Sequence, residues 1–254
     1  IEHAAHDLIV FVDDDCRVET DWLRRLVRPL DDPQLLGVQG GVTVPDDTNA
    51  IGWAETLLGF PGGGMARIHQ SRGEIQETME VSTLNAAYRK QAVINAGGFA
   101  AAARFGGEDY VLAKRVARQG RLLFVPSAFV RHAARGNFPA IWRWFVRRGT
   151  AETDLWRHNL ATDGFGGWMI RSSVGLKLLC VLLLWPWFDF WPIVLLFTVY
   201  VMLAWWRMRW CLYKQTTGYA VPWTAFAIVP AVKLCMDLAA DVGHLNRLLK
   251  RNNG

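Results

Sequence analysis

Cysteine is scarce in this chain of 254 residues: only Cys16, Cys180, Cys211 and Cys235 occur. They form no close pair and no metal-ligand spacing with histidine, so the sequence predicts no disulfide framework and favours a reducing compartment for the soluble part. No nucleic-acid recognition module accompanies the net charge of +5, which argues against a DNA or RNA partner. Internal repeats and low-complexity tracts are also absent.

A charged leader and a cleavage site are missing as well. The sequence opens at Ile1 in the middle of an amphipathic pattern. We therefore predict no signal peptide and expect the chain to be a fragment of a longer protein.

Apolar residues, in contrast, are abundant and crowd into residues 174–206. This segment would measure about 50 Å as one helix, longer than a hydrocarbon core of about 30 Å. Pro186, Asp189 and Pro192 predict a break, which gives a hairpin of two short membrane spans. The basic residues on both sides of the hairpin would then lie in the cytosol, as the positive-inside rule requires.

The first third of the chain is typical of an α/β protein. Residues 8–12 form a short β-branched run, which predicts a strand buried on both faces. Thr20 is the expected N-cap of a following helix, and residues 35–39 are the next predicted strand. A strand, an acidic turn, a helix and a second strand indicate an open sheet that binds ligands at its strand ends.

Further elements are expected downstream. Helices are predicted at 89–96 and 108–119, strands at 122–125 and 128–130, and a basic amphipathic helix at 139–158. Residues 221–245 predict an interfacial or partly inserted helix, with a third membrane span as the alternative.

Three consecutive aspartates, Asp13, Asp14 and Asp15, follow the first predicted strand. Neighbouring like charges repel, so each carboxylate needs compensation. Mg²⁺ or Mn²⁺ suits these hard oxygen ligands and would complete its shell with substrate phosphates. An acidic turn that only leads into a helix is the structural alternative. A phosphatase is disfavoured, because Arg17 stands where that pattern carries Thr or Val.

A second acidic pair, Glu108 and Asp109, follows Gly106 and Gly107 at a predicted helix start. The helix dipole alone would stabilise carboxylates at this place. In the functional interpretation, Asp109 is a general base that accepts the proton of an acceptor hydroxyl, and the glycine turn positions it.

Four motifs occur in order along the chain: an apolar strand ending in Asp-Asp-Asp, then Thr-Leu-Asn-Ala-Ala-Tyr-Arg, then Gly-Gly-Phe, then Gly-Glu-Asp-Tyr. This ordered set resembles the family 2 glycosyltransferases over roughly residues 4–149, and the apolar tail is similar to that of their membrane-bound branches. The resemblance implies a GT-A-like (Rossmann-like) mixed α/β sheet that lacks its first β-α-β unit and is followed by C-terminal transmembrane or interfacial helices.

The resemblance also implies roles for individual residues. Asp13 and Asp15 fall on the family's metal- and diphosphate-binding aspartates, and Asp14 falls near the donor ribose or sugar. Asn85 falls beside the donor sugar, and Asp109 falls on the catalytic base. Such enzymes invert the anomeric centre in one displacement, in which the metal stabilises the departing nucleotide diphosphate.

Four further positions follow from the same resemblance. Glu108 falls on the acid that orients substrate or base. His132 resembles a position that supplies another metal or phosphate contact, although a structural hydrogen bond is the alternative. Arg147 and Arg148 resemble basic residues that could meet a pyrophosphate near the bilayer, and a solvated, membrane-facing helix side is their alternative.

The basic helix departs from the processive synthases. Those enzymes carry a Gln-x-x-Arg-Trp motif. In this chain Arg143 and Trp144 match its last two residues, but Ala140 stands at the Gln position. A polymer-exporting channel is therefore not expected.

Four regions follow: a partial GT-A domain at 1–136, a basic amphipathic interfacial helix region at 137–173, a transmembrane hairpin at 174–206, and a basic loop with an interfacial or membrane helix at 207–254. The predicted function is an inverting, metal-dependent transferase with a cytoplasmic catalytic domain at the inner membrane. It would use a nucleotide-sugar donor, a lipid-linked or polysaccharide acceptor, and membrane lipids as partners. The rival hypothesis is a non-catalytic membrane scaffold built on a degenerate transferase domain.

Overall fold

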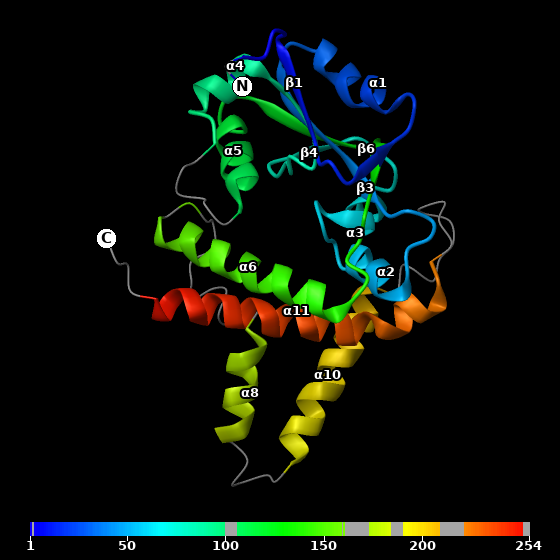
Figure 1. Ribbon diagram of the computed structural model, residues 1–254, viewed down its shortest axis with the longest axis vertical. Coiled ribbons are helices and arrows are strands. Elements are labelled where there is room, and N and C mark those ends of the chain that lie inside the picture. The colour runs from blue at the N-terminus through cyan, green and yellow to red at the C-terminus, as the bar shows by residue number, and fades with distance from the viewer. Residues whose placement is uncertain are drawn as a thin grey trace.

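The computed structural model describes residues 1, 3–99, 106–158, 160, 173–183, 190–208 and 221–250. A mixed sheet fills one end, two long helices lie beneath it, and two shorter helices project from the far side of that pair (Figure 1). The order along the sheet is β1 (Leu8–Val12), β5 (Asn85–Arg89), β3 (Leu35–Thr43), β6 (Arg121–His132) and β2 (Cys16–Val18), with β4 (Gln76–Thr78) also on β6. Among the described strand pairs, β3–β6 alone is parallel, and the predicted mixed α/β fold is confirmed.

Two strand predictions need correction. Strand β1 is half-buried at the edge of the described sheet, not buried on both faces, because only β5 pairs with it there. The two short strands predicted at 122–130 are one long strand, β6. Pro126 cannot donate a hydrogen bond, but the β3–β6 register shifts between Gly40 and Val42, so β6 passes this point and continues.

Helices cover both faces of the sheet. Helix α1 (Trp22–Val27) and the 3₁₀ turn Arg28–Asp31 pack on one face through Leu26 and Leu30. Asp21, not Thr20, is the N-cap residue of α1, and its side chain makes no capping bond. The opposite face is covered by α4 (Lys90–Asn95) and α5 (Glu108–Val116).

Helices α6 (Phe138–Arg157) and α11 (Trp223–Leu249) lie side by side beneath the sheet (Figure 1). Their backbones approach closely, since a Cβ on Gly243 would lie 2.1 Å from the carbonyl oxygen of Val146. Val229 and Met236 of α11 are buried with residues of α2 (Ala50–Leu57) and α3 (Gly64–Gln70). Helix α11 is therefore part of the folded core, and although it is long enough to cross a membrane, it is not among the described helices that are also apolar enough.

Helices α8 (Val174–Leu183) and α10 (Trp191–Met208) project away from α11 (Figure 1). Among the described residues, α10 alone is long and apolar enough to cross a membrane, with a mean hydropathy of 1.4 and little burial. The described part of helix α8 is about 15 Å long, shorter than a hydrocarbon core of about 30 Å. The predicted pair of spans is therefore not supported. Pro192 lies in the first turn of α10, whereas Pro186 and Asp189 fall outside the described residues.

Candidate active site

Asp13, Asp15 and His132 form a cluster at one end of the sheet. The antiparallel pairing of β2 with β6 sets Cys16 opposite His132 and so brings the acidic turn to the end of β6. One ligand atom from each of the three side chains lies within 4.8 Å of the others. His132 Nε2 lies 3.2 Å from an Asp15 carboxylate oxygen. The buried Nδ1 of His132 has no hydrogen-bond partner in the described part of the chain.

The electrostatics of this cluster favour a cation. Burial raises the pKa of the Asp13 carboxyl, nearby His132 opposes the shift, and the negative charges of Asp15, Asp14 and Asp109 add to it. Two carboxylates and an imidazole form a donor set that Mg²⁺ and Mn²⁺ accept. The residues present therefore fit a divalent metal ion, and they do not distinguish between these two.

Asp109 reaches the same region from the other side. Gly106 and Gly107 have φ angles of 130° and 85°, which glycine adopts without strain, and the chain then enters α5. A Cβ on Gly107 would lie 2.8 Å from Leu155 Cδ1 of α6, so this turn packs against α6. The Asp109 carboxylate accepts a hydrogen bond from the Tyr110 backbone N–H at 2.7 Å, as expected at a helix start.

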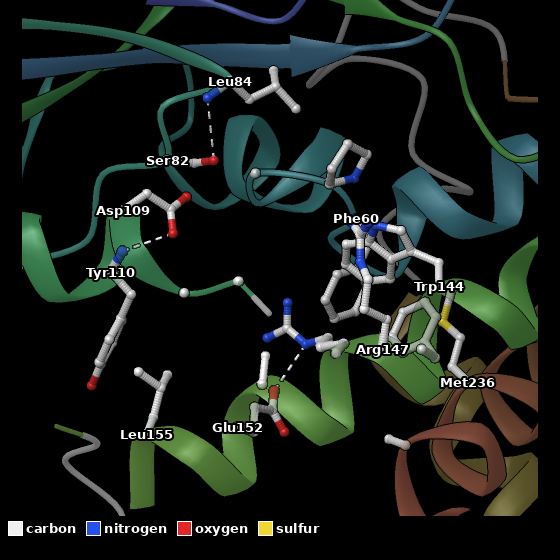
Figure 2. Close-up of a pocket in the computed structure, with 18 of the residues that line it drawn as sticks. Phe60, Ser82, Leu84, Asp109, Tyr110, Trp144, Arg147, Glu152, Leu155 and Met236 are labelled. Atoms are coloured by element: carbon white, nitrogen blue, oxygen red, sulfur yellow. Dashed lines mark hydrogen bonds and ion pairs between the residues drawn. The ribbon is translucent and has the colours of Figure 1, made fainter. Parts of the chain in front are cut away.

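A cavity of about 680 Å³ lies between the sheet and the two long helices, which is within the usual range for a ligand site. Asp13 and His132 line it from the sheet, and Glu108 and Asp109 line it from α5. Figure 2 shows Asp109 on the side of the cavity opposite Glu152 of α6, with Phe60 and Trp144 along another wall. Two acidic segments that are distant in sequence thus share one cavity.

Two of the predicted substrate-binding residues lie elsewhere. Asp14 is exposed and is not among the residues that line the cavity. Asn85 is fully buried, and its side chain donates to the carbonyls of Gly41 and Ala128 and accepts from Trp22 Nε1. These three bonds use the Asn85 amide within the core, so the structure gives this side chain a packing role, and its contact with the donor stays a prediction.

Arg147 and Arg148 both line the cavity, as a pyrophosphate-binding role requires. The Arg148 guanidinium lies over the rings of Phe60 and Trp144, at 4.9 and 5.7 Å from their centroids. Its Nε donates to Glu152 at 2.9 Å.

Sequence reasoning missed several cavity residues. Arg135 stacks on Trp144 at 4.2 Å and forms an ion pair with the fully buried Glu55 of α2. Its position three residues after His132 was the available indication in the sequence that Arg135 lies near the site. Lys233 and Asp237 line the cavity from α11, and their four-residue spacing puts both on one helix face. The sequence alone could not show that this face turns toward the acidic residues.

Polar residues of α11 also form hydrogen bonds with the projecting helices α8 and α10. Tyr200 of α10 donates a hydrogen bond to Asp237 at 2.9 Å, and Lys233 donates to both oxygens of the same carboxylate. Asp241, four residues further, accepts from Gly175 N–H at the start of α8 and from Ser173. This wall of the cavity is thus bonded to both α8 and α10.

Comparison with solved structures supports the fold. The mannosyltransferase PcManGT from Pyrobaculum calidifontis, solved in complex with GDP-Man and Mn²⁺, is 17% identical and aligns with a TM-score of 0.56. The alignment covers 96% of this chain but 64% of that one, so the chain spans less than two thirds of PcManGT. GalNAc-T7, solved with UDP, GalNAc and Mn²⁺, aligns at a TM-score of 0.37 and 15% identity over 68% of this chain and 41% of that one. That similarity is too weak to bear on the fold.

Comparison with protein families is more decisive. No curated protein matches the chain in sequence. The sequence model of glycosyl transferase family 21 matches residues 1–245, nearly the whole length. The resemblance to family 2 is therefore not confirmed at the level of the family, although the expectation of a glycosyltransferase with a GT-A-like fold is. This chain belongs to glycosyl transferase family 21.

Proposed function

We propose that the complete protein is an inverting hexosyltransferase that moves a sugar from a nucleotide-diphosphate donor to a membrane-proximal acceptor, in polysaccharide or glycolipid biosynthesis. One observation carries the proposal: Asp13 and His132 of the acidic cluster line the same cavity as Asp109. The fold of PcManGT, whose solved complex contains GDP-Man and Mn²⁺, supports a nucleotide-sugar donor.

The acidic cluster is the proposed metal site. Asp13, Asp15 and His132 would hold Mg²⁺ or Mn²⁺, and the bound cation would offset the charge of the departing nucleoside diphosphate. Asp14, exposed beside the cluster, remains a proposed contact of the donor ribose or sugar. Arg147 and Arg148 line the cavity and would add positive charge beside the diphosphate.

Asp109 is the proposed catalytic base. As the acceptor oxygen bonds to the anomeric carbon, its hydroxyl proton passes to the Asp109 carboxylate. The bond between that carbon and the diphosphate oxygen breaks with its electrons on the oxygen, so the configuration inverts and a nucleoside diphosphate leaves. Glu108, adjacent on the cavity wall, would orient the acceptor or the base.

A lipid-linked or membrane-bound polysaccharide acceptor suits the α11 wall. Asp237 and Asp241 line the cavity and are bonded to α10 and α8, and exposed apolar residues cover α10. A cavity whose wall is hydrogen-bonded to an exposed apolar helix can receive an acceptor from a membrane surface. We therefore propose an inner-membrane location, with the catalytic region on the cytoplasmic side.

The test uses the complete protein with a panel of nucleotide sugars that includes GDP-mannose, and a native membrane extract as the acceptor source. We expect Asp109→Asn to reduce nucleoside diphosphate release about 10²- to 10⁴-fold, a loss much larger than any change in Mn²⁺ affinity at neutral pH. Exposed Glu74→Gln is the control. Undiminished turnover in Asp109→Asn would eliminate the base role, and a wild-type protein that turns over no nucleotide sugar would contradict the function itself.

A further inference from the structure

A chain of polar contacts runs from α11 through α6 into the cavity. His244 of α11, only 1% exposed, has Nδ1 2.9 Å from the Thr153 hydroxyl and Nε2 3.3 Å from a Glu152 carboxylate oxygen. The other oxygen of Glu152 accepts from Arg148 Nε at 2.9 Å. Glu152 and Arg148 both line the cavity, so the chain ends at a cation that faces the candidate active site.

The packing of the two helices fixes the buried end of this chain. The His244 ring stacks on Trp156, with ring centroids 4.6 Å apart and planes 16° from parallel. The preceding residue, Gly243, touches the α6 backbone so closely that a Cβ would overlap the Val146 carbonyl. The position of His244 against Glu152 is therefore set by the α6–α11 contact and not by a flexible side chain alone.

Glu152 differs from an ordinary helix-surface partner of arginine. Exposed pairs spaced four residues apart contribute little, because water competes for both charges. Here burial works to raise the pKa of Glu152, but the close contact with His244 and the charge of Arg148 outweigh it and lower that pKa. The carboxylate is thus held in its charged form on the cavity wall, with both oxygens engaged.

Arg148 is held on two sides and open on a third. Glu152 binds Nε, and the rings of Phe60 and Trp144 lie against the guanidinium. No described residue accepts a hydrogen bond from its two terminal nitrogens. A planar guanidinium that is fixed in this way binds a diphosphate with little further loss of side-chain freedom.

We infer that Glu152, supported by His244, is a positioning residue that orients Arg148 toward a diphosphate in the cavity. The inference rests on the proposed function and adds to it a residue that touches neither the metal site nor the base. The same chemistry could come from the nucleotide donor or from a lipid diphosphate, and separate arms of the experiment distinguish these sources.

The experiment measures binding to the complete protein in nanodiscs by calorimetry. Inorganic pyrophosphate with saturating Mn²⁺ is the first probe, followed by GDP in solution and by a polyprenyl diphosphate in the nanodisc. We expect Glu152→Gln to weaken pyrophosphate binding about tenfold, while Mn²⁺ binding without pyrophosphate is unchanged. Exposed Glu74→Gln is the matched control. Weakening with GDP alone would identify the nucleotide as the ligand, and weakening with the lipid alone would identify the lipid.

A double-mutant cycle separates positioning from a general structural effect. In an Arg148→Ala background, Glu152→Gln should cause no further loss, because the residue that it orients is absent. Glu152→Asp, which keeps the charge, should restore part of the affinity, and it replaces Glu152→Gln if that variant does not fold.

Three results would overturn the inference: wild-type affinity in a folded Glu152 variant, no restoration by aspartate, or the same loss in both backgrounds. If the wild-type protein binds Mn²⁺ and pyrophosphate and the Glu152→Gln variant binds both equally well, this inference alone is contradicted. A wild-type protein that binds neither contradicts the proposed function as well.

Discussion

Asp13, which follows strand β1, and Asp109, in the first turn of helix α5, line the same cavity, and the charge of Asp109 contributes to the raised pKa of Asp13. A carboxylate whose negative charge raises the pKa of another is unfavourable as a purely structural arrangement. A divalent cation reverses the effect, because it favours the ionised form of each. The relationship between these two residues therefore gives direct tests of a metal site.

The first prediction concerns pH. The pKa of Asp13 lies above its ordinary value of 3.8, and a metal ion binds the carboxylate and not the acid. Mn²⁺ affinity should therefore begin to fall at a higher pH than an ordinary aspartate site would show, as the pH is lowered from neutrality. Because the Asp109 charge contributes to the shift, Asp109→Asn should move the fall to lower pH. Calorimetric titration of Mn²⁺ checks both, and identical profiles would contradict the electrostatic link.

The second prediction concerns stability without metal. A carboxyl whose pKa is raised on folding favours the protonated form in the folded state, so its ionised form costs stability above the folded pKa. Asp13→Asn should therefore raise Tm at neutral pH in metal-free buffer, and the difference should shrink as the pH falls through the pKa of Asp13. Added Mn²⁺ should raise the wild-type Tm by mass action and leave the variant nearly unchanged.

Exposed Asp47→Asn is the matched control for this prediction, with no effect on Tm or on the response to Mn²⁺. A lower metal-free Tm for Asp13→Asn would show that the carboxylate stabilises the fold through its own contacts.

Local patterns were sufficient to predict part of this structure. The strand at 8–12 and the glycine turn before Asp109 depend on neighbours in sequence, and both were found. The core packing of Asn85 could not be predicted, because a motif does not reveal which way a side chain points. Gly40 decides that direction: a Cβ there would lie 2.2 Å from the Asn85 amide nitrogen, so only glycine leaves room for the buried amide.

Contacts between distant segments were beyond the reach of the sequence. The apolar pattern of α11 favoured an interfacial or a membrane helix, and only its packing against α6 and α2 shows that it belongs to the core. The cavity-lining roles of Arg135 and Lys233 depend on the same tertiary packing. The His132 ligand position, in contrast, could be expected from a histidine that ends a strand, once the strand pairing was known.

The third prediction tests the structural role of Asn85. Its replacement by alanine would leave two buried carbonyls and the Trp22 indole N–H without partners. Each unsatisfied group costs about 1–3 kcal/mol, and partial relaxation should give a total loss of about 2–4 kcal/mol. Urea unfolding measures this loss, with exposed Asn95→Ala as the control at about 0.5 kcal/mol or less. Unchanged stability together with weaker donor binding would instead restore the original assignment of Asn85.

The fourth prediction concerns α10 and the membrane. Leu195 and Met202 are 65% and 63% exposed, and their seven-residue spacing puts them on one side of the helix. If this side lies in lipid, Leu195→Lys with Met202→Lys should release the protein from vesicles of phosphatidylethanolamine and phosphatidylglycerol, because each lysine at the bilayer centre costs about 2.5–3.5 kcal/mol. Flotation on a density gradient measures the bound fraction.

Ile94→Lys supplies the control for the membrane experiment, since it adds the same charge at an exposed apolar position of α4, on the far side of the sheet from α10 (Figure 1). This variant should float like the wild type. A Leu195→Lys, Met202→Lys protein that also floats like the wild type would mean that α10 does not attach the chain to lipid. The exposed apolar side would then have to be covered by protein, because an uncovered patch of that size favours association in water.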